Sequence, residues 1–219
     1  EDGIRDFCLS RGLGDVYKRQ VLTMPLHSKD GNTELSDLHA YQLVEKYSNV
    51  TLVNVDLSET YDKFMLNVDD TFTGNDLANA NTKSRLRMVA LYQVAGSVGG
   101  IVVGTGNKVE DYGVGFFTKY GDGGVDIAPI ADIYKTQVWE LGRHLGVDER
   151  IINATPTDGL WEDGRTDEGQ LGASYEQLEE AMEHGTGPAL DILEEFNTKN
   201  KHKMEPIPTF KLEKHYANS

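Results

Sequence analysis

Cysteine is almost absent from the sequence, with a single residue, Cys8, in a chain of 219. One cysteine excludes a disulfide within the chain and any metal site built from several thiolates. This scarcity is typical of proteins in a reducing compartment, so we expect a cytoplasmic location. Hydrophobic runs long enough to cross a lipid bilayer are also missing, and we expect no membrane role.

Positive charge is scarce as well. Lysine and arginine together number 21 against 36 aspartates and glutamates, which gives a formal net charge of −15. Binding to nucleic acid depends on neutralising phosphates with Lys and Arg, so this charge argues against a DNA or RNA partner. A smaller phosphate ligand would have to be met by a local concentration of basic residues. The length suits one well-packed α/β domain.

Residues 1–20 differ in character from the remainder of the chain. Their sequence has no clean helical or strand period, and it runs into an apolar stretch at Val21 without a linker. We interpret this segment as foreign to the domain, either artefactual or disordered; an ordinary frayed terminus is the alternative. The domain itself is expected over residues 21–219.

Past residue 20, strand-like and helix-like patterns alternate. Short apolar runs predict strands at Val21–Leu26, Val50–Val55 and Ile101–Val103. Helical spacing and cap signals predict helices from Thr33 to about Tyr47, around 61–68, at 76–97, after Asp132 to Gly146, from Ser174 to Gly185, and after Pro188. Alternation of this kind favours a parallel sheet with helices on both faces.

A glycine-rich stretch from Gly104 to Asp126 follows the third expected strand. Ligands of open α/β sheets bind beyond the carboxyl ends of the strands, and glycines let the backbone approach a ligand closely. Lys108 and Lys119 could meet an anion there, and the acidic residues could hold a metal or accept hydrogen bonds: Glu110, Asp111, Asp122 and Asp126. A flexible surface loop that happens to be rich in glycine is the alternative.

Five segments of the chain together resemble the NAD synthetase family. In order, they are residues 81–88 (NTKSRLRM), 104–111 (GTGNKVED), 115–126 (GFFTKYGDGGVD), 156–161 (PTDGLW) and 202–204 (HKM). The resemblance spans roughly residues 21–210. It implies a doubly wound, mainly parallel α/β sheet of the adenine-nucleotide-hydrolase-like (Rossmann-like) type. The implied activity is ATP-dependent amidation of deamido-NAD to NAD by ammonia, with release of AMP and pyrophosphate.

The family's site residues carry over position by position. The resemblance implies that ATP contacts Thr105, Lys135 and Thr157, and that Glu110 helps to hold Mg²⁺. Deamido-NAD would contact Arg85, Lys119, Asp126, His202 and Lys203, partly from the second subunit of a homodimer. Lysines and a divalent cation suit this chemistry because the substrate carboxylate must approach a negatively charged ATP phosphate. The sequence assigns no catalytic residue.

One family motif does not occur. The phosphate-binding loop Ser-Gly-Gly-x-Asp-Ser, which follows the family's first strand, has only a weak counterpart at Ser10–Asp15. We therefore expect a domain without its first strand, phosphate loop and first helix, and a polypeptide with little or no synthetase activity. Two alternatives remain: a non-catalytic dinucleotide-binding module, and an ATP pyrophosphatase that amidates another carboxylate.

Overall fold

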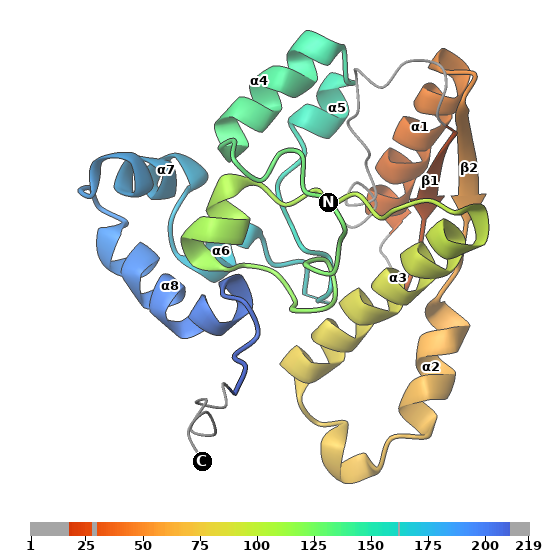
Figure 1. Cartoon of the computed structure of the whole chain (residues 1–219), viewed down its shortest axis with the longest axis horizontal. Coiled ribbons are helices and arrows are strands. Elements are labelled where there is room, and N and C mark those ends of the chain that lie inside the picture. Colours follow the sequence, from red (N-terminus) through yellow and green to blue (C-terminus); the bar gives the residue numbers. More distant parts are fainter. Residues whose placement is uncertain (1–17, 28–29, 162, 211–219) are drawn as a thin grey trace, which may run out of the picture.

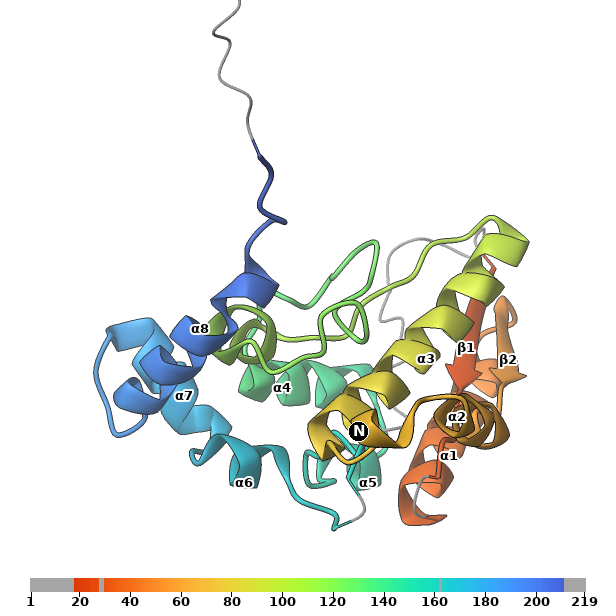
Figure 2. The ribbon, with the colours of Figure 1, turned by 90° about the horizontal axis from the view of Figure 1, so that it is seen from below.

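The computed structural model describes residues 18–27, 30–161 and 163–210. Strand β1 and helices α1, α2 and α3 (red to yellow) lie on one side of the molecule, and α6, α7 and α8 (cyan to blue) lie on the other (Figure 1). The green segment after α3 runs between the two sides (Figure 2). No helix in the described part of the chain is long and apolar enough to cross a membrane. The counterpart of the phosphate loop at Ser10–Asp15 lies outside the described residues.

The N-terminal half is built around two parallel strands, β1 (Arg19–Thr23) and β2 (Val50–Asn54), paired from Arg19↔Val50 to Thr23↔Asn54. Successive side chains of a strand point to opposite faces of the sheet. Val21 accordingly packs in a cluster with Ala40 of α1 (Asp30–Lys46). Leu22 packs in a separate cluster with Ala90 of α3. The sheet is therefore covered by helices on both faces, as the alternating pattern predicts.

Helices α2 and α3 follow the second strand. The order is α2 (Ser58–Leu66), the short 3₁₀ turn η1 (Asp70–Phe72) and α3 (Asp76–Val98). The Asn75 side chain caps α3 by accepting a hydrogen bond from Ala78 N at 2.9 Å, and Gly99 ends it with a φ of 66°. Helix α1 begins at Asp30, so it starts earlier in the chain than the cap signal at Thr33 indicates.

The third expected strand is reduced to a single parallel bridge between Val103 and Ile127. Backbone hydrogen bonds join Gly104 N to Ile127 O at 2.7 Å and Asp126 N to Val102 O at 2.9 Å. Apolar residues 101–103 thus pair over one residue only within the described chain. Val102 is buried but Ile101 is 59% exposed, so the apolar run predicts neither a full ladder nor full burial here.

The C-terminal half packs around a second core. Its elements are the π-helical turn η2 (Val109–Val114), α4 (Lys135–Leu145), α5 (Glu149–Ile152), α6 (Asp167–Leu171), α7 (Tyr175–His184) and α8 (Leu190–Met204). Val109, Val114, Tyr175 and Leu178 are fully buried in this core. The Ser174–Gln177 capping box and the Gly185 cap confirm the sequence prediction for α7.

Helix α4 begins two residues later than its cap signal indicates. Tyr134 occupies the N-cap position, whereas the Asp132 carboxylate lies 3.2 Å from the Lys108 ammonium. A carboxylate that pairs with a nearby lysine is not available to cap the helix. The result brings Lys135 to the first turn of α4, beside the glycine-rich segment.

Candidate functional site

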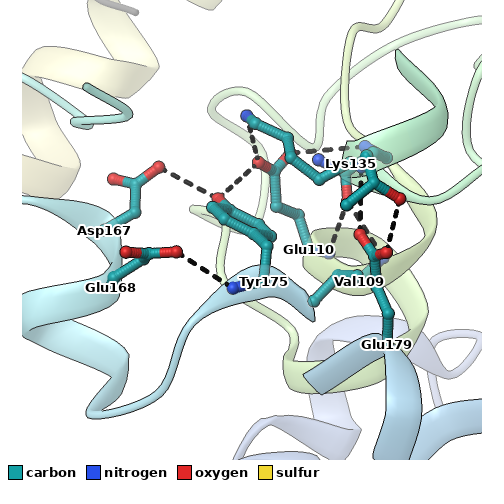
Figure 3. A network of polar contacts seen from close by, with 9 residues as sticks. Val109, Glu110, Lys135, Asp167, Glu168, Tyr175 and Glu179 are labelled. Atoms are coloured by element: carbon teal, nitrogen blue, oxygen red, sulfur yellow. Dashed lines mark hydrogen bonds and ion pairs between the residues drawn. The ribbon is translucent and has the colours of Figure 1, made fainter. Parts of the chain in front are cut away.

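Glu110 lies on η2, where the chain leaves the Val103–Ile127 bridge. The buried Asn107 side chain fixes the start of this turn, since its Oδ1 accepts hydrogen bonds from Val109 N at 3.0 Å and Glu110 N at 3.2 Å. Glu110 Oε1 accepts hydrogen bonds from the Lys135 ammonium at 3.1 Å and from the Tyr175 hydroxyl at 2.9 Å (Figure 3). Two residues assigned separately to metal and ATP therefore form one ion pair.

Lys135 is a buried lysine, with 6% of its surface exposed. The start of its helix is fixed to α7: Glu179 accepts hydrogen bonds from Thr136 N at 3.0 Å and from Thr136 Oγ1 at 2.6 Å. The Lys135 ammonium also lies 4.9 Å from the centre of the Tyr175 ring, a favourable position for a cation over an aromatic face. Its charge is therefore held in place by an acid and a ring before any ligand binds.

Tyr175 and Asp167 complete this buried network, and no pattern in the sequence predicts either role. Both are 0% exposed, and the Tyr175 hydroxyl lies 3.1 Å from Asp167 Oδ2. Glu168 Oε1 accepts a hydrogen bond from Tyr175 N at 3.0 Å (Figure 3). The Ser174–Gln177 capping box located the helix that begins at Tyr175, but a cap pattern contains no information about a hydroxyl partner 65 residues away.

The Glu110 carboxylate could supply one oxygen ligand to a Mg²⁺ ion. Its Oε1 points to Lys135 and Tyr175, while Oε2 accepts one long hydrogen bond, 3.3 Å from Asn107 N, within the described residues. No group of three or more metal-binding side chains gathers in the part of the chain that the structure describes. Mg²⁺ is commonly held by one or two carboxylates together with water and substrate phosphates, which this arrangement allows.

Four of the five residues predicted for deamido-NAD lie around residues 115–120. Arg85 Nε of α3 donates a hydrogen bond to Lys119 O at 3.2 Å, and Lys119 Nζ donates to His202 O at 2.6 Å. Lys203 Nζ donates to Gly115 O at 2.7 Å and Phe117 O at 2.8 Å. The long helix α3, the glycine-rich segment and the end of α8 thus bring together basic residues that are far apart in the sequence.

Helix α8 holds this segment through side chains three residues apart. Asn197 Nδ2 donates to Gly113 O at 2.9 Å, and buried Asn200 Nδ2 donates to Val114 O at 2.8 Å. Lys203 continues the row. Burial lowers the pKa of Lys203, because a desolvated ammonium is less stable than a hydrated one. The family resemblance predicts that Lys203 contacts the substrate; in the structure its ammonium supports the backbone of the segment that carries Lys119.

Asp126 lies apart from that basic group. Its Oδ2 accepts a hydrogen bond from Val102 N at 2.7 Å, and its Oδ1 accepts one from the Tyr92 hydroxyl of α3 at 3.1 Å. Partial burial raises the pKa of Tyr92, and the hydrogen bond to Asp126 adds to this effect. The carboxylate, between two apolar neighbours, has the polar partners that its position requires.

Thr105 and Thr157 lie in two different parts of the structure. Thr105 lines a cavity together with residues of α3, of the glycine-rich segment and of the loop after α5, among them Ser84, Arg87, Gly104, Asp122 and Leu160. Thr157 belongs to that last loop and bonds within it: its hydroxyl donates to Arg165 O at 3.0 Å and accepts from Gly159 N at 3.1 Å. Lys83 Nζ links the loop to α3 through Leu160 O at 3.3 Å.

Comparison with known sequences finds one family. The sequence model of the NAD synthase family matches residues 11–215. That match begins inside the segment 1–20 that the sequence analysis separates from the domain, and the boundary at residue 21 stays a prediction.

Curated relatives are NH(3)-dependent NAD(+) synthetases. The protein of Carboxydothermus hydrogenoformans is 39% identical over 166 residues, which cover 74% of this chain and 68% of the relative. The protein of Finegoldia magna is 34% identical over 196 residues, which cover 88% of this chain and 77% of the relative. The chain spans less than two thirds of several other relatives, for example 56% of the Sulfolobus acidocaldarius protein at 43% identity.

Solved structures similar to this chain include an NMN synthetase and NAD synthetases. The NMN synthetase of Francisella tularensis superposes with a TM-score of 0.80 at 30% identity, over 89% of this chain and 79% of that one. The NAD+ synthetase of Burkholderia pseudomallei superposes with a TM-score of 0.60 at 29% identity, over 84% of this chain and 68% of that one. An NH3-dependent NAD synthetase of Campylobacter jejuni gives 0.64 at 21% identity over 88% and 77%, which supports the fold alone.

Proposed function

The chain belongs to the NAD synthase family, and on that premise we propose that it amidates deamido-NAD to NAD with ammonia at the expense of ATP. The observation that carries the proposal is the Glu110–Lys135 pair, 3.1 Å apart, at the edge of the glycine-rich segment. Lys135 supplies a fixed cation that can bind a phosphate, and Glu110 beside it supplies a carboxylate that can bind Mg²⁺. Such a pair suits a reaction in which two anionic groups must meet.

The reaction requires activation of a carboxylate. A carboxylate is a poor electrophile, so the nicotinate carboxylate is first joined to the α-phosphate of ATP, with loss of pyrophosphate, and ammonia then displaces AMP. Lys135 would contact the phosphates as a positive charge held in place, which costs little reorganisation during the reaction. Glu110 would hold Mg²⁺, which when bound offsets phosphate charge. Thr105 and Thr157 would bind other parts of ATP.

The basic group around residues 115–120 would receive the second nucleotide. Arg85, Lys119 and the end of α8 supply positive charge in a chain of net charge −15, and this local concentration is what an anionic dinucleotide needs. We assign Arg85, Lys119, His202 and Lys203 to deamido-NAD on this basis, and we assign Asp126, which lies apart from them, on the family resemblance alone. Lys203 would act mainly through the backbone of Gly115 and Phe117.

A product assay tests the proposal. Purified protein is incubated with deamido-NAD, ATP, Mg²⁺ and an ammonium salt, and nucleotides are quantified by mass spectrometry over long times to detect a slow reaction. The proposal expects NAD and AMP in equal amounts, each dependent on ammonia. Formation of ADP in place of AMP would contradict it. Binding of deamido-NAD without any turnover, even after the family's phosphate loop is added upstream, would favour the non-catalytic module.

A mononucleotide substrate is the second candidate. The observation that favours it is the similarity to the Francisella tularensis NMN synthetase, with a TM-score of 0.80. In that case the chain would amidate nicotinic acid mononucleotide to NMN. Parallel assays with both substrates separate the two: a larger kcat/KM for the mononucleotide would assign the chain to that reaction.

Replacing Lys119 by methionine is expected to weaken binding of deamido-NAD roughly tenfold, because a hydrogen bond to a charged group is lost. ATP affinity should not change, since Lys119 contacts His202 O and not the Glu110–Lys135 pair. Titration calorimetry with each nucleotide measures both values. Lys199→Met, which removes an exposed lysine of α8, is the matched control. Unchanged deamido-NAD affinity would exclude Lys119 from the substrate site.

A homodimer is part of the proposal. Exposed apolar side chains on α3 and on the segments beside it support such a contact: Leu77, Val89, Val98, Ile101 and Ile127 are 44–60% exposed. We propose that some of these side chains belong to the subunit contact, since exposed apolar surface often marks interaction sites. Light scattering should give a mass twice that of one chain at micromolar concentration, and Val89→Glu should shift it towards the monomer. A monomeric mass for the unmodified protein would contradict the proposed homodimer.

The cytoplasmic location stays a prediction.

A further inference from the structure

The buried hydroxyl of Tyr175 lies between two carboxylates, either of which can accept its one proton. It lies 2.9 Å from Glu110 Oε1 and 3.1 Å from Asp167 Oδ2 (Figure 3). The Tyr175 and Asp167 residues are 0% exposed. Packing alone would be satisfied by phenylalanine, whereas a buried tyrosine requires a polar partner for its hydroxyl. The hydroxyl therefore has a role that the hydrophobic core does not explain.

We propose that Tyr175, supported by Asp167, is a positioning residue for the Mg·ATP site, an inference that rests on the proposed function. It holds the Glu110 carboxylate in the rotation that leaves Oε2 for the metal. It also fixes the Lys135 ammonium over its ring, 4.9 Å from the ring centre. Neither Tyr175 nor Asp167 needs to touch ATP for this role.

The orientation of Glu110 follows from its contacts. Its Oε1 has two strong donors, Lys135 and Tyr175, while Oε2 accepts one 3.3 Å bond from Asn107 N within the described chain. A carboxylate with one oxygen fixed loses little rotational freedom when the other binds a cation. Groups that orient a metal ligand in this way typically raise metal affinity by about 10–100-fold.

Asp167 extends the network to the loop that carries Thr157. Its backbone N donates to Pro156 O at 3.0 Å, and its carboxylate meets the Tyr175 hydroxyl. Tyr175 N is in turn bound by Glu168 Oε1 at 3.0 Å. One tyrosine thus connects three separate parts of the predicted ATP site: Glu110 on η2, Lys135 on α4 and the residue next to Thr157.

Tyr175→Phe isolates the hydroxyl, because the ring beneath Lys135 is kept. Titration calorimetry with ATP, in the presence and in the absence of Mg²⁺, measures its effect, and a titration with deamido-NAD is run in parallel. We expect ATP affinity in Mg²⁺ to fall about tenfold, within the range for groups that orient a metal ligand. The affinity for ATP without Mg²⁺ and the affinity for deamido-NAD should both stay within about twofold of the unmodified protein, because the hydroxyl acts through the metal ligand alone.

Two further variants complete the experiment. Tyr112→Phe changes an exposed tyrosine of η2 and should bind all ligands normally. Asp167→Asn keeps the size of the side chain, and it serves as the test where Tyr175→Phe does not fold. It should weaken ATP binding only in Mg²⁺.

The outcomes separate the inference from the proposed function. A loss confined to ATP with Mg²⁺ supports the positioning role. Normal Mg·ATP binding by both Tyr175→Phe and Asp167→Asn, or an equal loss for every ligand, would overturn it while the proposed function stands. Failure of the unmodified protein to bind Mg·ATP would overturn the proposed function and this inference with it.

Discussion

Replacement of Lys135 by methionine is expected to weaken ATP binding about 100-fold and to destabilise the fold by about 3 kcal/mol, because the lysine is half of a largely buried ion pair. The variant leaves the Glu110 carboxylate, 15% exposed, without its cation. It also removes the only positive charge that α4 directs to Glu110 among the described contacts. A carboxylate without compensation then faces the incoming phosphates, so binding and stability fall together.

Two measurements test this prediction: urea unfolding for stability and calorimetry for ATP. Lys63→Met is the matched control, since Lys63 of α2 pairs with Glu59 and both side chains are largely exposed. An exposed pair contributes little in water, so this control should behave as the unmodified protein. Normal ATP affinity in Lys135→Met would exclude Lys135 from the nucleotide site, whatever the change in stability.

The second large effect is expected for Gly115→Ala. Gly115 ends η2 with a φ of 62°, and a Cβ added there would lie 2.6 Å from the Asn200 Cβ of α8. The left-handed conformation costs an alanine about 1–2 kcal/mol. Relief of the close contact requires α8 and η2 to separate, and overpacking of this kind costs about 1–3 kcal/mol more. We expect a total loss of about 3 kcal/mol.

The functional consequence of Gly115→Ala follows from the position of Lys203. Its ammonium donates to Gly115 O and Phe117 O, so a shift of η2 away from α8 breaks the support of the Lys119 segment. Deamido-NAD affinity should fall more than ATP affinity. Gly99→Ala is the control, since φ is 66° there and nothing lies within 4 Å of the added Cβ. Equal unfolding free energies for the two variants would contradict the steric part of the argument.

Local signals in the sequence predicted some helix ends and misplaced others. Gly99 ends α3 and the Ser174–Gln177 box begins α7, because caps act through residues that are neighbours in the chain. Helix α1 begins before the cap expected at Thr33, and α4 begins after the cap expected at Asp132. The strand at 101–103 was predicted less well. Its apolar residues indicate burial, yet Ile101 is exposed, and the described chain supplies only one bridge, to Ile127, because a ladder depends on a partner elsewhere.

In the site too, the sequence predicts residues but not the contacts between residues that are distant in the chain. Family resemblance named Glu110 and Lys135, but the 3.1 Å contact between them depends on how η2 and α4 pack. Tyr175 carried no sequence signal, since a buried hydroxyl reads as an ordinary aromatic core residue. Lys203 was assigned to the substrate, whereas its ammonium lies against two backbone carbonyls. Residue types are visible in the sequence; their partners are set by tertiary packing.

We propose that one site receives two anionic nucleotides, with Lys135 and Glu110 at its centre. A crystal structure with ATP, Mg²⁺ and deamido-NAD tests this proposal most directly. We predict a triphosphate oxygen within hydrogen-bonding distance of Lys135 Nζ, a metal at Glu110 Oε2, and the dinucleotide beside Arg85 and Lys119. ATP bound elsewhere, with the Glu110–Lys135 pair away from both nucleotides, would contradict the account.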